Sequence, residues 1–283
     1  MIVELDHRLF LAQDYALINP MQVGKEQYAD LNARRLLPKG MERHERMLPL
    51  LVHLASLNES QRIELLERTE QWARHYHMPL FSALFSSQYA PDRVNADLLV
   101  RVVLRRASGQ RAWLRYHDPR VFRHLQWLLD KEQLAALMGP AQTWLGFDPL
   151  CRHWHQWPRP DVSGHPRLRL DAGQWQAVAH FEALNHCLRD LADEGEASDD
   201  DTARALLDGL LEARQQGLAQ SMDAMLYARQ RLEHGPGMSQ LPAVALRLRQ
   251  TREYQTSYVA ACDTLSIDDF LRPMGAARSR TKD

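Results

Sequence analysis

Cysteine, lysine and long hydrophobic runs are all scarce in this sequence of 283 residues. The cysteines, Cys151, Cys187 and Cys262, are too few and too widely spaced for a disulfide framework, which favours a reducing compartment. No stretch approaches the roughly 18–20 uncharged apolar residues of a membrane span. A signal peptide begins with basic residues before its apolar run, but this sequence has Glu4 and Asp6 there, so we expect no signal peptide. We therefore expect a cytoplasmic protein without membrane insertion.

An excess of charge of either sign is also missing. Lysine and arginine number 35 against 36 aspartates and glutamates, and this balance argues against a dedicated nucleic-acid binder. The glycines form no dinucleotide-binding or P-loop motif, and neither a serine-hydrolase elbow nor an H-E-x-x-H motif occurs. We therefore expect no cofactor, no nucleic-acid partner and no enzymatic activity.

Strand-like and helix-like segments alternate through the first 157 residues. The predicted strands cover residues 9–19, 47–57, 80–87, 111–116, 141–147 and 151–157. The predicted helices cover residues 59–77, a stretch that begins at Asp92 or Asn95, and residues 120–129 and 131–138. This alternation predicts an α/β lobe with a mixed sheet.

The pattern changes after residue 160. Residues 172–192, 202–217, 221–234 and 242–264 all have helical spacing. We predict two lobes, an α/β lobe over residues 1–160 and an all-helical lobe over residues 161–270, followed by a disordered tail over residues 271–283. The acidic segment 190–202 is expected to be a solvated loop. The net charge of +4 in the first lobe and −5 in the remainder would suit docking on a polar partner.

The densest polar cluster lies between Arg115 and Arg120, where Tyr116, His117 and Asp118 separate the two arginines. Neighbouring strand residues point to opposite faces, so His117 and Asp118 cannot easily act on one substrate atom. Asp118 also precedes a proline at the expected start of a helix. We interpret the cluster as a local staple, with Asp118 as helix cap and arginine partner, and catalysis as the alternative.

Cys151, His153 and His155 are the best candidates for metal ligands. If residues 151–157 form a strand, its period of two places the three side chains on one face, where they could share a zinc ion. The sequence offers no fourth ligand at short spacing. A metal-dependent hydrolase that uses these residues is therefore an alternative function.

One segment resembles a known family. Residues 113–145, WLRYHDPRVFRHLQWLLDKEQLAALMGPAQTWL, resemble the central motif of the type VI secretion effector-loading adaptors, long described only as a domain of unknown function. The matching residues are Arg115, Asp118, Pro119, Arg120, Val121, Glu132, Gln133, Leu134, Gly139 and Pro140. His117 stands where the family commonly has an aromatic residue. PLLVHL at residues 49–54, FSALFSS at 81–87 and the helical segment 213–238 are similar to further parts of the family.

The resemblance implies a non-enzymatic adaptor chaperone. Such proteins hold a secreted toxin, the effector, and help load it onto the valine–glycine repeat (VgrG) spike. By this resemblance Arg115, Tyr116, Asp118 and Arg120 organise the α/β lobe or contact a partner. An immunity protein that neutralises a toxin shares this binding chemistry and is a further alternative. The identity of the effector, the oligomeric state and any ordering of the 190–202 loop stay open.

The helical lobe offers a candidate surface for the effector at Met222, Met225 and Leu226. Adaptable, methionine-rich surfaces suit the binding of a helix in a groove. Helical spacing alone does not orient a helix face, so these three residues are equally compatible with a place in the core.

Overall fold

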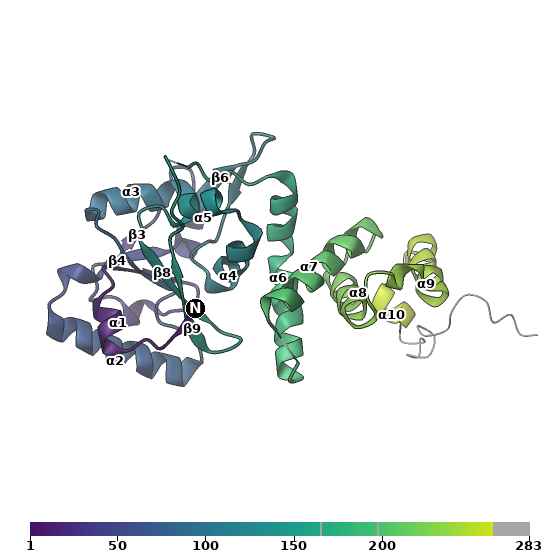
Figure 1. Cartoon of the computed structure of the whole chain (residues 1–283), viewed down its shortest axis with the longest axis horizontal. Helices are drawn as coiled ribbons and strands as arrows, with labels where there is room; N and C mark the ends of the chain where they lie inside the picture. The colour runs from purple at the N-terminus through teal and green to yellow at the C-terminus, as the bar shows by residue number, and fades with distance from the viewer. Residues whose placement is uncertain (165, 197, 263–283) are drawn as a thin grey trace, which may run out of the picture. The chain divides into compact units, whose positions relative to one another are not determined.

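A seven-stranded sheet forms the centre of the N-terminal half of the chain (Figure 1). The computed structural model describes residues 1–164, 166–196 and 198–262. In spatial order the strands are β1 (Ile2–Val3), β9 (His153–Pro158), β8 (Thr143–Asp148), β5 (Ala83–Ser86), β2 (Tyr15–Ile18), β4 (Leu50–His53) and β3 (Arg34–Arg35). A separate ribbon pairs β6 (Val103–Arg105) with β7 (Arg111–Trp113).

Every strand pair in the described residues is antiparallel, so the prediction of a mixed sheet is wrong. Strands β4 and β5 do run in the same direction, as a strand–helix–strand unit predicts. They are not neighbours, however, because β2 lies between them and pairs antiparallel with both. Alternation along the sequence indicates the direction of the strands, but it does not indicate which strand is inserted between two others.

Helices cover both faces of this sheet. In the N-terminal half they are α1 (His7–Leu11), α2 (Glu59–Tyr76), α3 (Pro91–Val102), α4 (Pro119–Leu128) and α5 (Lys131–Met138). Neighbouring residues of a strand point to opposite faces, yet all four residues of β2 are buried. Both faces of the central strands are therefore covered, and the α/β class of this lobe is confirmed.

Local signals explain where the helices begin. Asn58 and Asp130 each form a capping box with a glutamine three residues later, and they start α2 and α5. The prediction of one strand over residues 9–19 is wrong in its first half. The side chain of Asp6 accepts a hydrogen bond from the Leu9 amide at 2.7 Å, which caps α1. Only Tyr15–Ile18 enters the sheet.

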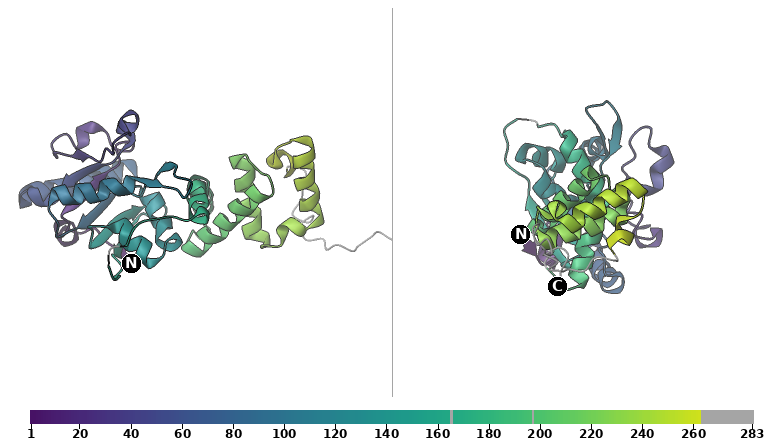
Figure 2. Two further views of the ribbon diagram at one scale, coloured as in Figure 1. Left: turned by 90° about the horizontal axis from the view of Figure 1, so that it is seen from above. Right: turned by 90° about the vertical axis from the view of Figure 1, so that its right-hand side faces the viewer.

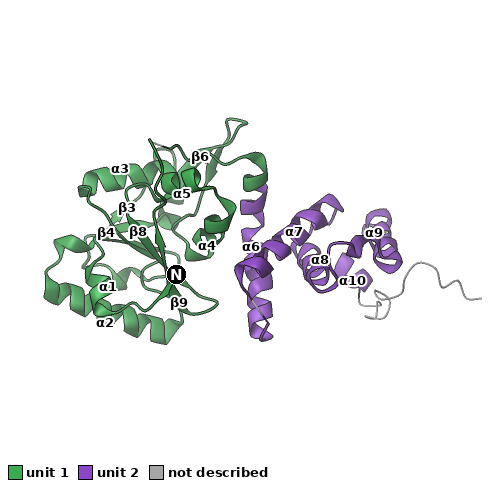
Figure 3. Cartoon of the chain, in the orientation of Figure 1, with its two compact units in different colours: residues 1–175 green, residues 176–283 purple. Residues whose placement is uncertain are grey.

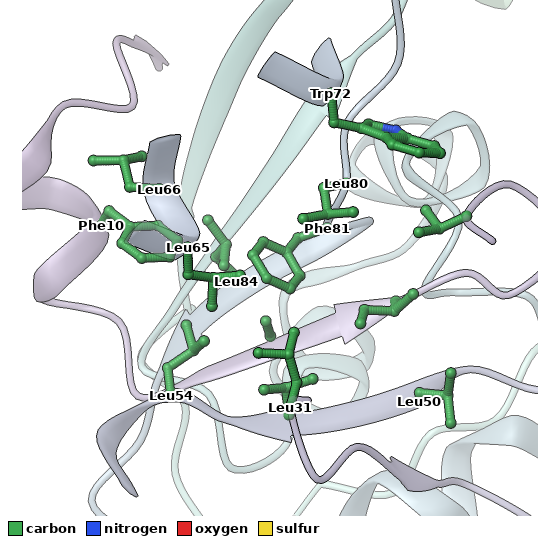
Figure 4. Packing of buried hydrophobic residues seen from close by; sticks show 14 of the residues in the cluster. Phe10, Leu31, Leu50, Leu54, Leu65, Leu66, Trp72, Leu80, Phe81 and Leu84 are labelled. Atoms are coloured by element: carbon green, nitrogen blue, oxygen red, sulfur yellow. The ribbon is translucent and has the colours of Figure 1, made fainter. Parts of the chain in front are cut away.

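The face covered by α1 and α2 holds one apolar cluster, shown in Figure 4. Phe10 from α1 and Leu65 from α2 pack there with Leu84 of β5. Each fully buried side chain of this size stabilises the fold by about 1.5–3 kcal/mol. This face therefore forms a hydrophobic core between the sheet and the two helices.

The opposite face carries a continuous aromatic stack. Tyr15 stacks on Phe85 with ring centroids 5.3 Å apart, Phe85 on Trp144 at 5.5 Å, and Trp144 on Phe122 of α4 at 4.7 Å. Aromatic pairs of this kind contribute about 0.5–1.5 kcal/mol each beyond the area that they bury. The stack therefore fixes α4, and the loop that precedes it, against the sheet.

The chain divides into two compact units, residues 1–175 (unit 1) and 176–283 (unit 2), coloured separately in Figure 3. Residue 160, the predicted domain boundary, lies within unit 1. The remaining helices are α6 (Ala172–Asp193), α7 (Asp200–Gln215), α8 (Ser221–His234), α9 (Pro242–Tyr254) and α10 (Tyr258–Cys262).

Within unit 2, α7 and α8 pack closely (Figure 2). A Cβ atom on Gly209 would lie 2.8 Å from the Cα of Ala228, so only glycine permits this approach. Helices are the only regular secondary structure in the described part of unit 2, which agrees with the predicted helical region. The tail predicted over residues 271–283 lies outside the described residues.

Candidate functional site

Asp118 occupies the junction between the β6–β7 ribbon and α4. It is the N-cap of α4, and its Oδ1 accepts a hydrogen bond from the Arg120 amide at 3.1 Å. Oδ2 of the same carboxylate accepts hydrogen bonds from Arg115 at 3.0 Å and from Arg120 at 2.8 Å. We call Arg115, Asp118 and Arg120 the arginine junction. The cap and the arginine pairs that the spacing indicated are both present.

Burial and charge act in opposite directions on this carboxylate. The side chain of Asp118 is 2% exposed, and burial alone would raise its pKa. Hydrogen bonding to Arg120, together with the charges of Arg120 and Arg115, overcomes this effect and lowers the pKa of Asp118 below its ordinary value. The arginine side chains stay 42% and 35% exposed. The junction therefore holds a buried anion beneath two cations that face solvent.

Tyr116 and His117 lie beneath the surface at this junction. The Tyr116 hydroxyl donates a hydrogen bond to the Leu98 carbonyl oxygen at 3.2 Å, and burial raises the pKa of Tyr116. Burial lowers the pKa of His117 to about 4, so its imidazole is neutral at physiological pH. Tyr116 ties the loop to α3, and it is buried together with His117, whereas the side chains of Arg115 and Arg120 stay partly exposed.

A second buried ion pair, which sequence reasoning missed, joins α4 to the sheet. Arg123 of α4 lies 2.8 Å from Asp148 at the end of β8, and these side chains are 9% and 7% exposed. Both residues belong to elements that the sequence predicts. Nothing in their spacing along the chain indicates that they meet, because α5 and the rest of β8 lie between them.

The predicted metal ligands are only partly brought together. The strand expected over residues 151–157 begins at His153, and Cys151 lies in the preceding turn, where Arg152 has a positive φ of 56°. The period of two therefore does not extend to Cys151. Asp148 takes the place of His153 in the group, and we call Asp148, Cys151 and His155 the hairpin cluster.

The ligand atoms of the hairpin cluster lie within 4.8 Å of one another, with Cys151 Sγ 3.5 Å from His155 Nε2. These three residues are the set in the described chain that could hold a metal. Burial and the charge of Asp148 raise the pKa of the Cys151 thiol, so the thiol is not an activated nucleophile. Arg123 already neutralises the Asp148 carboxylate, and this contact opposes the binding of a further cation.

The three predicted contact residues of the helical region differ in exposure. Met222 is 64% exposed, whereas Met225 and Leu226 are half-buried. On another face of α8 the buried Asp223 accepts hydrogen bonds from the Ser257 hydroxyl at 2.7 Å and the Val259 amide at 3.0 Å. The face of α8 that carries Asp223 thus packs against the start of α10, and Met222 does not lie on that face.

Met222 and Met225 line a hollow of about 440 Å³ formed by α6, the α7–α8 loop and the start of α8. A second hollow, of about 560 Å³, lies between α6 and the end of α7. The two share Ala179, His180 and Arg214, and we call them together the helical groove. Sequence reasoning missed His180 and Arg214, because in the sequence they are only two of many polar residues on predicted helices.

None of the helices in the described part of the chain has the length and apolar character needed to cross a membrane. No curated protein and no solved structure matches the chain. Residues 26–136, which include the arginine junction and its surrounding helices, match the model of a family described as a domain of unknown function (DUF4123) and associated with type VI secretion effector-loading adaptors.

Proposed function

We propose that this chain is a non-enzymatic adaptor of the type VI secretion system. It binds one cognate effector in the cytoplasm and helps to load that effector onto the VgrG spike. The observation that carries this proposal is the family match over residues 26–136. The residues that resemble the family motif in the sequence, Arg115, Asp118 and Arg120, lie within the matched segment.

The geometry of both units is compatible with protein binding. In unit 1 the arginine junction displays two guanidinium groups above a buried carboxylate that holds them in place. Arginine is enriched at interfaces because its planar group forms paired hydrogen bonds. In unit 2 the helical groove presents apolar side chains beside an exposed methionine. These are two separate surfaces on which an effector and a spike protein could be held.

The test is affinity capture with the tagged full-length chain in its native strain, followed by mass spectrometry. We expect a secreted toxin and a VgrG protein among the captured proteins, and neither with an unrelated protein that carries the same tag. Capture of neither would overturn the proposal. Deletion of the gene is further expected to stop secretion of the captured toxin, and reintroduction of the wild-type gene is expected to restore it.

Expression of the toxin in a second host separates the adaptor from an immunity protein. A toxin alone reduces growth, and an immunity protein restores it when expressed beside the toxin. An adaptor binds the toxin without being required for protection when the toxin is already in its target compartment. Full protection by this chain in that compartment would favour the immunity function over the adaptor.

A further inference from the structure

We propose that the helical groove of unit 2 binds an amphipathic helix of the effector, which places apolar side chains in the groove and a carboxylate beside Arg214. This inference rests on the proposed function and names the segment that the adaptor would recognise.

The shape of the groove favours a helix. Its two hollows follow α6 from Gln176 to His186. Ten residues of helix span about 15 Å, which is nearly three helical turns. The described part of unit 2 contains no strand, so an extended peptide would find no sheet edge to pair with. We therefore expect a partner to bind in this groove as a helix.

Small and flexible apolar side chains form much of the groove. Ala179 and Ala183 of α6 and Ala219 of the α7–α8 loop line it and let another backbone approach closely. Met222 and Met225 line the same hollow, and Met222 is 64% exposed. An unbranched thioether adapts to differently shaped partners. These side chains match the apolar face of an amphipathic helix.

One charged side chain of the groove lacks a counter-ion among the described residues. Arg214 lies in the last turn of α7 and is exposed, and its side chain has no hydrogen-bond or ion-pair partner among the described residues. In contrast, Arg231 and Arg229 of the same unit are paired with glutamates at 2.6 Å and 2.5 Å. His180 and His186 also line the groove, where Glu182 is the only acidic residue. A carboxylate on the bound helix would supply the partner that Arg214 lacks.

The first test places a photo-crosslinking residue, benzoylphenylalanine, at Met222 of the full-length chain in the native strain. The matched control carries it at Met21, which is 60% exposed in unit 1. We expect crosslinks from position 222, but not from position 21, to one effector segment that is amphipathic and carries Asp or Glu. Crosslinks from position 222 to a second copy of the chain, to residues 263–283, or to nothing would each overturn the inference.

The second test measures the affinity of the purified chain for the captured effector. We expect Arg214→Glu to weaken binding tenfold or more, because like charges then face each other in the groove. Arg189→Glu is the control, since Arg189 is exposed on α6 and does not line the groove. Replacement by Arg of the Asp or Glu in the crosslinked effector segment should restore the affinity of that effector for the Arg214→Glu variant. Far-UV circular dichroism confirms that each variant is folded.

The outcomes separate the two proposals. If the wild-type chain captures an effector and Arg214→Glu binds it as tightly as the wild type, the groove inference fails and the adaptor function stands. If the wild-type chain captures no effector and no VgrG, the adaptor function fails and the groove inference fails with it.

Discussion

Removal of the Asp118 carboxylate is expected to destabilise unit 1 far more than removal of an ordinary helix cap. Asp118 caps α4 and also accepts hydrogen bonds from Arg115 and Arg120. Asp130 caps the next helix, α5: its side chain accepts a hydrogen bond from the Gln133 amide at 2.8 Å. Asp130 is exposed and has no ion pair among the residues that the structure describes. Asp118→Ala and Asp130→Ala therefore form a matched pair.

The magnitudes follow from these contacts. Loss of a cap costs about 1 kcal/mol, which is the cost expected for Asp130→Ala. Hydrogen bonds to charged groups contribute about 1.5–3 kcal/mol each when shielded, and the partly exposed arginines at Asp118 reduce this to about 1 kcal/mol apiece. We expect Asp118→Ala to cost about 3 kcal/mol. Asp118→Asn keeps the capping oxygen and should cost about 1–2 kcal/mol.

Tryptophan fluorescence measures unit 1 selectively, because all seven tryptophans lie in residues 1–175. In urea, with a slope of about 2 kcal/mol per molar, Asp118→Ala should lower the unfolding midpoint by about 1.5 M. The lowered pKa of Asp118 also sets the pH dependence. The stabilisation is present above the unfolded pKa of about 4 and is lost as the pH falls through the lower folded pKa. The difference between wild type and Asp118→Ala should therefore shrink in acid.

Equal costs for Asp118→Ala and Asp130→Ala would refute this reasoning, because they would show that the arginine contacts add nothing. A cost of Asp118→Asn equal to that of Asp118→Ala would show that the negative charge accounts for the whole effect and the cap for none. Both comparisons require unchanged slopes of the urea transitions, which report an unchanged unfolded state.

Three further predictions concern other parts of the chain. The first concerns His117, whose pKa is about 4 in the folded chain and about 6.5 in the unfolded chain, so the unfolded chain gains its proton first as the pH falls. The wild-type unit 1 should therefore lose about 3 kcal/mol of stability between pH 6.5 and 4, and His117→Leu should remove this loss. An unchanged pH profile of urea unfolding would contradict this. The second concerns the contact between α7 and α8, where Gly209→Ala should destabilise unit 2 by about 1–3 kcal/mol. The loss should be seen in far-UV circular dichroism but not in tryptophan fluorescence. The control Gly237→Ala should have no effect, because a Cβ atom at Gly237 meets no neighbouring atom. The third concerns the hairpin cluster, where Arg123 already forms an ion pair with the Asp148 carboxylate. The chain purified without a histidine tag should therefore contain far less than one zinc per molecule by elemental analysis. One tightly held zinc per chain would refute this.

Local chemistry made several elements predictable. The helix at residues 59–77 was predicted from Asn58 and the spacing of its apolar residues, and α2 begins after that cap. Proline after Asp118 likewise indicated the start of α4. The segment at residues 9–19 was misassigned because its apolar run contains both a short helix and a strand. Apolar composition alone does not separate the two, and the deciding cap is Asp6.

The candidate sites were less predictable because they depend on contacts between distant elements. Cys151 and His155 do meet, but Asp148 joins them from β8 in place of His153. The helical groove depends on how three helices pack, so the sequence does not indicate that Arg214 lines it without a side-chain partner in the described part of the chain. The sequence does not tell which face of its helix Met222 occupies, whereas the structure shows that Asp223 bonds the start of α10 and that Met222 is 64% exposed.

The sequence by itself determined the alternation of strands and helices in unit 1, the helical character of unit 2 and the caps, because these depend on hydrogen bonds and periodicities that span only a few residues. It also contained the arginine junction, whose members are close along the chain. The tertiary structure alone decided that β2 separates β4 from β5, that Arg123 meets Asp148, and that Arg214 lines the helical groove without a side-chain partner among the described residues. Each of these depends on which distant faces bury each other, and a single periodic pattern does not contain that choice.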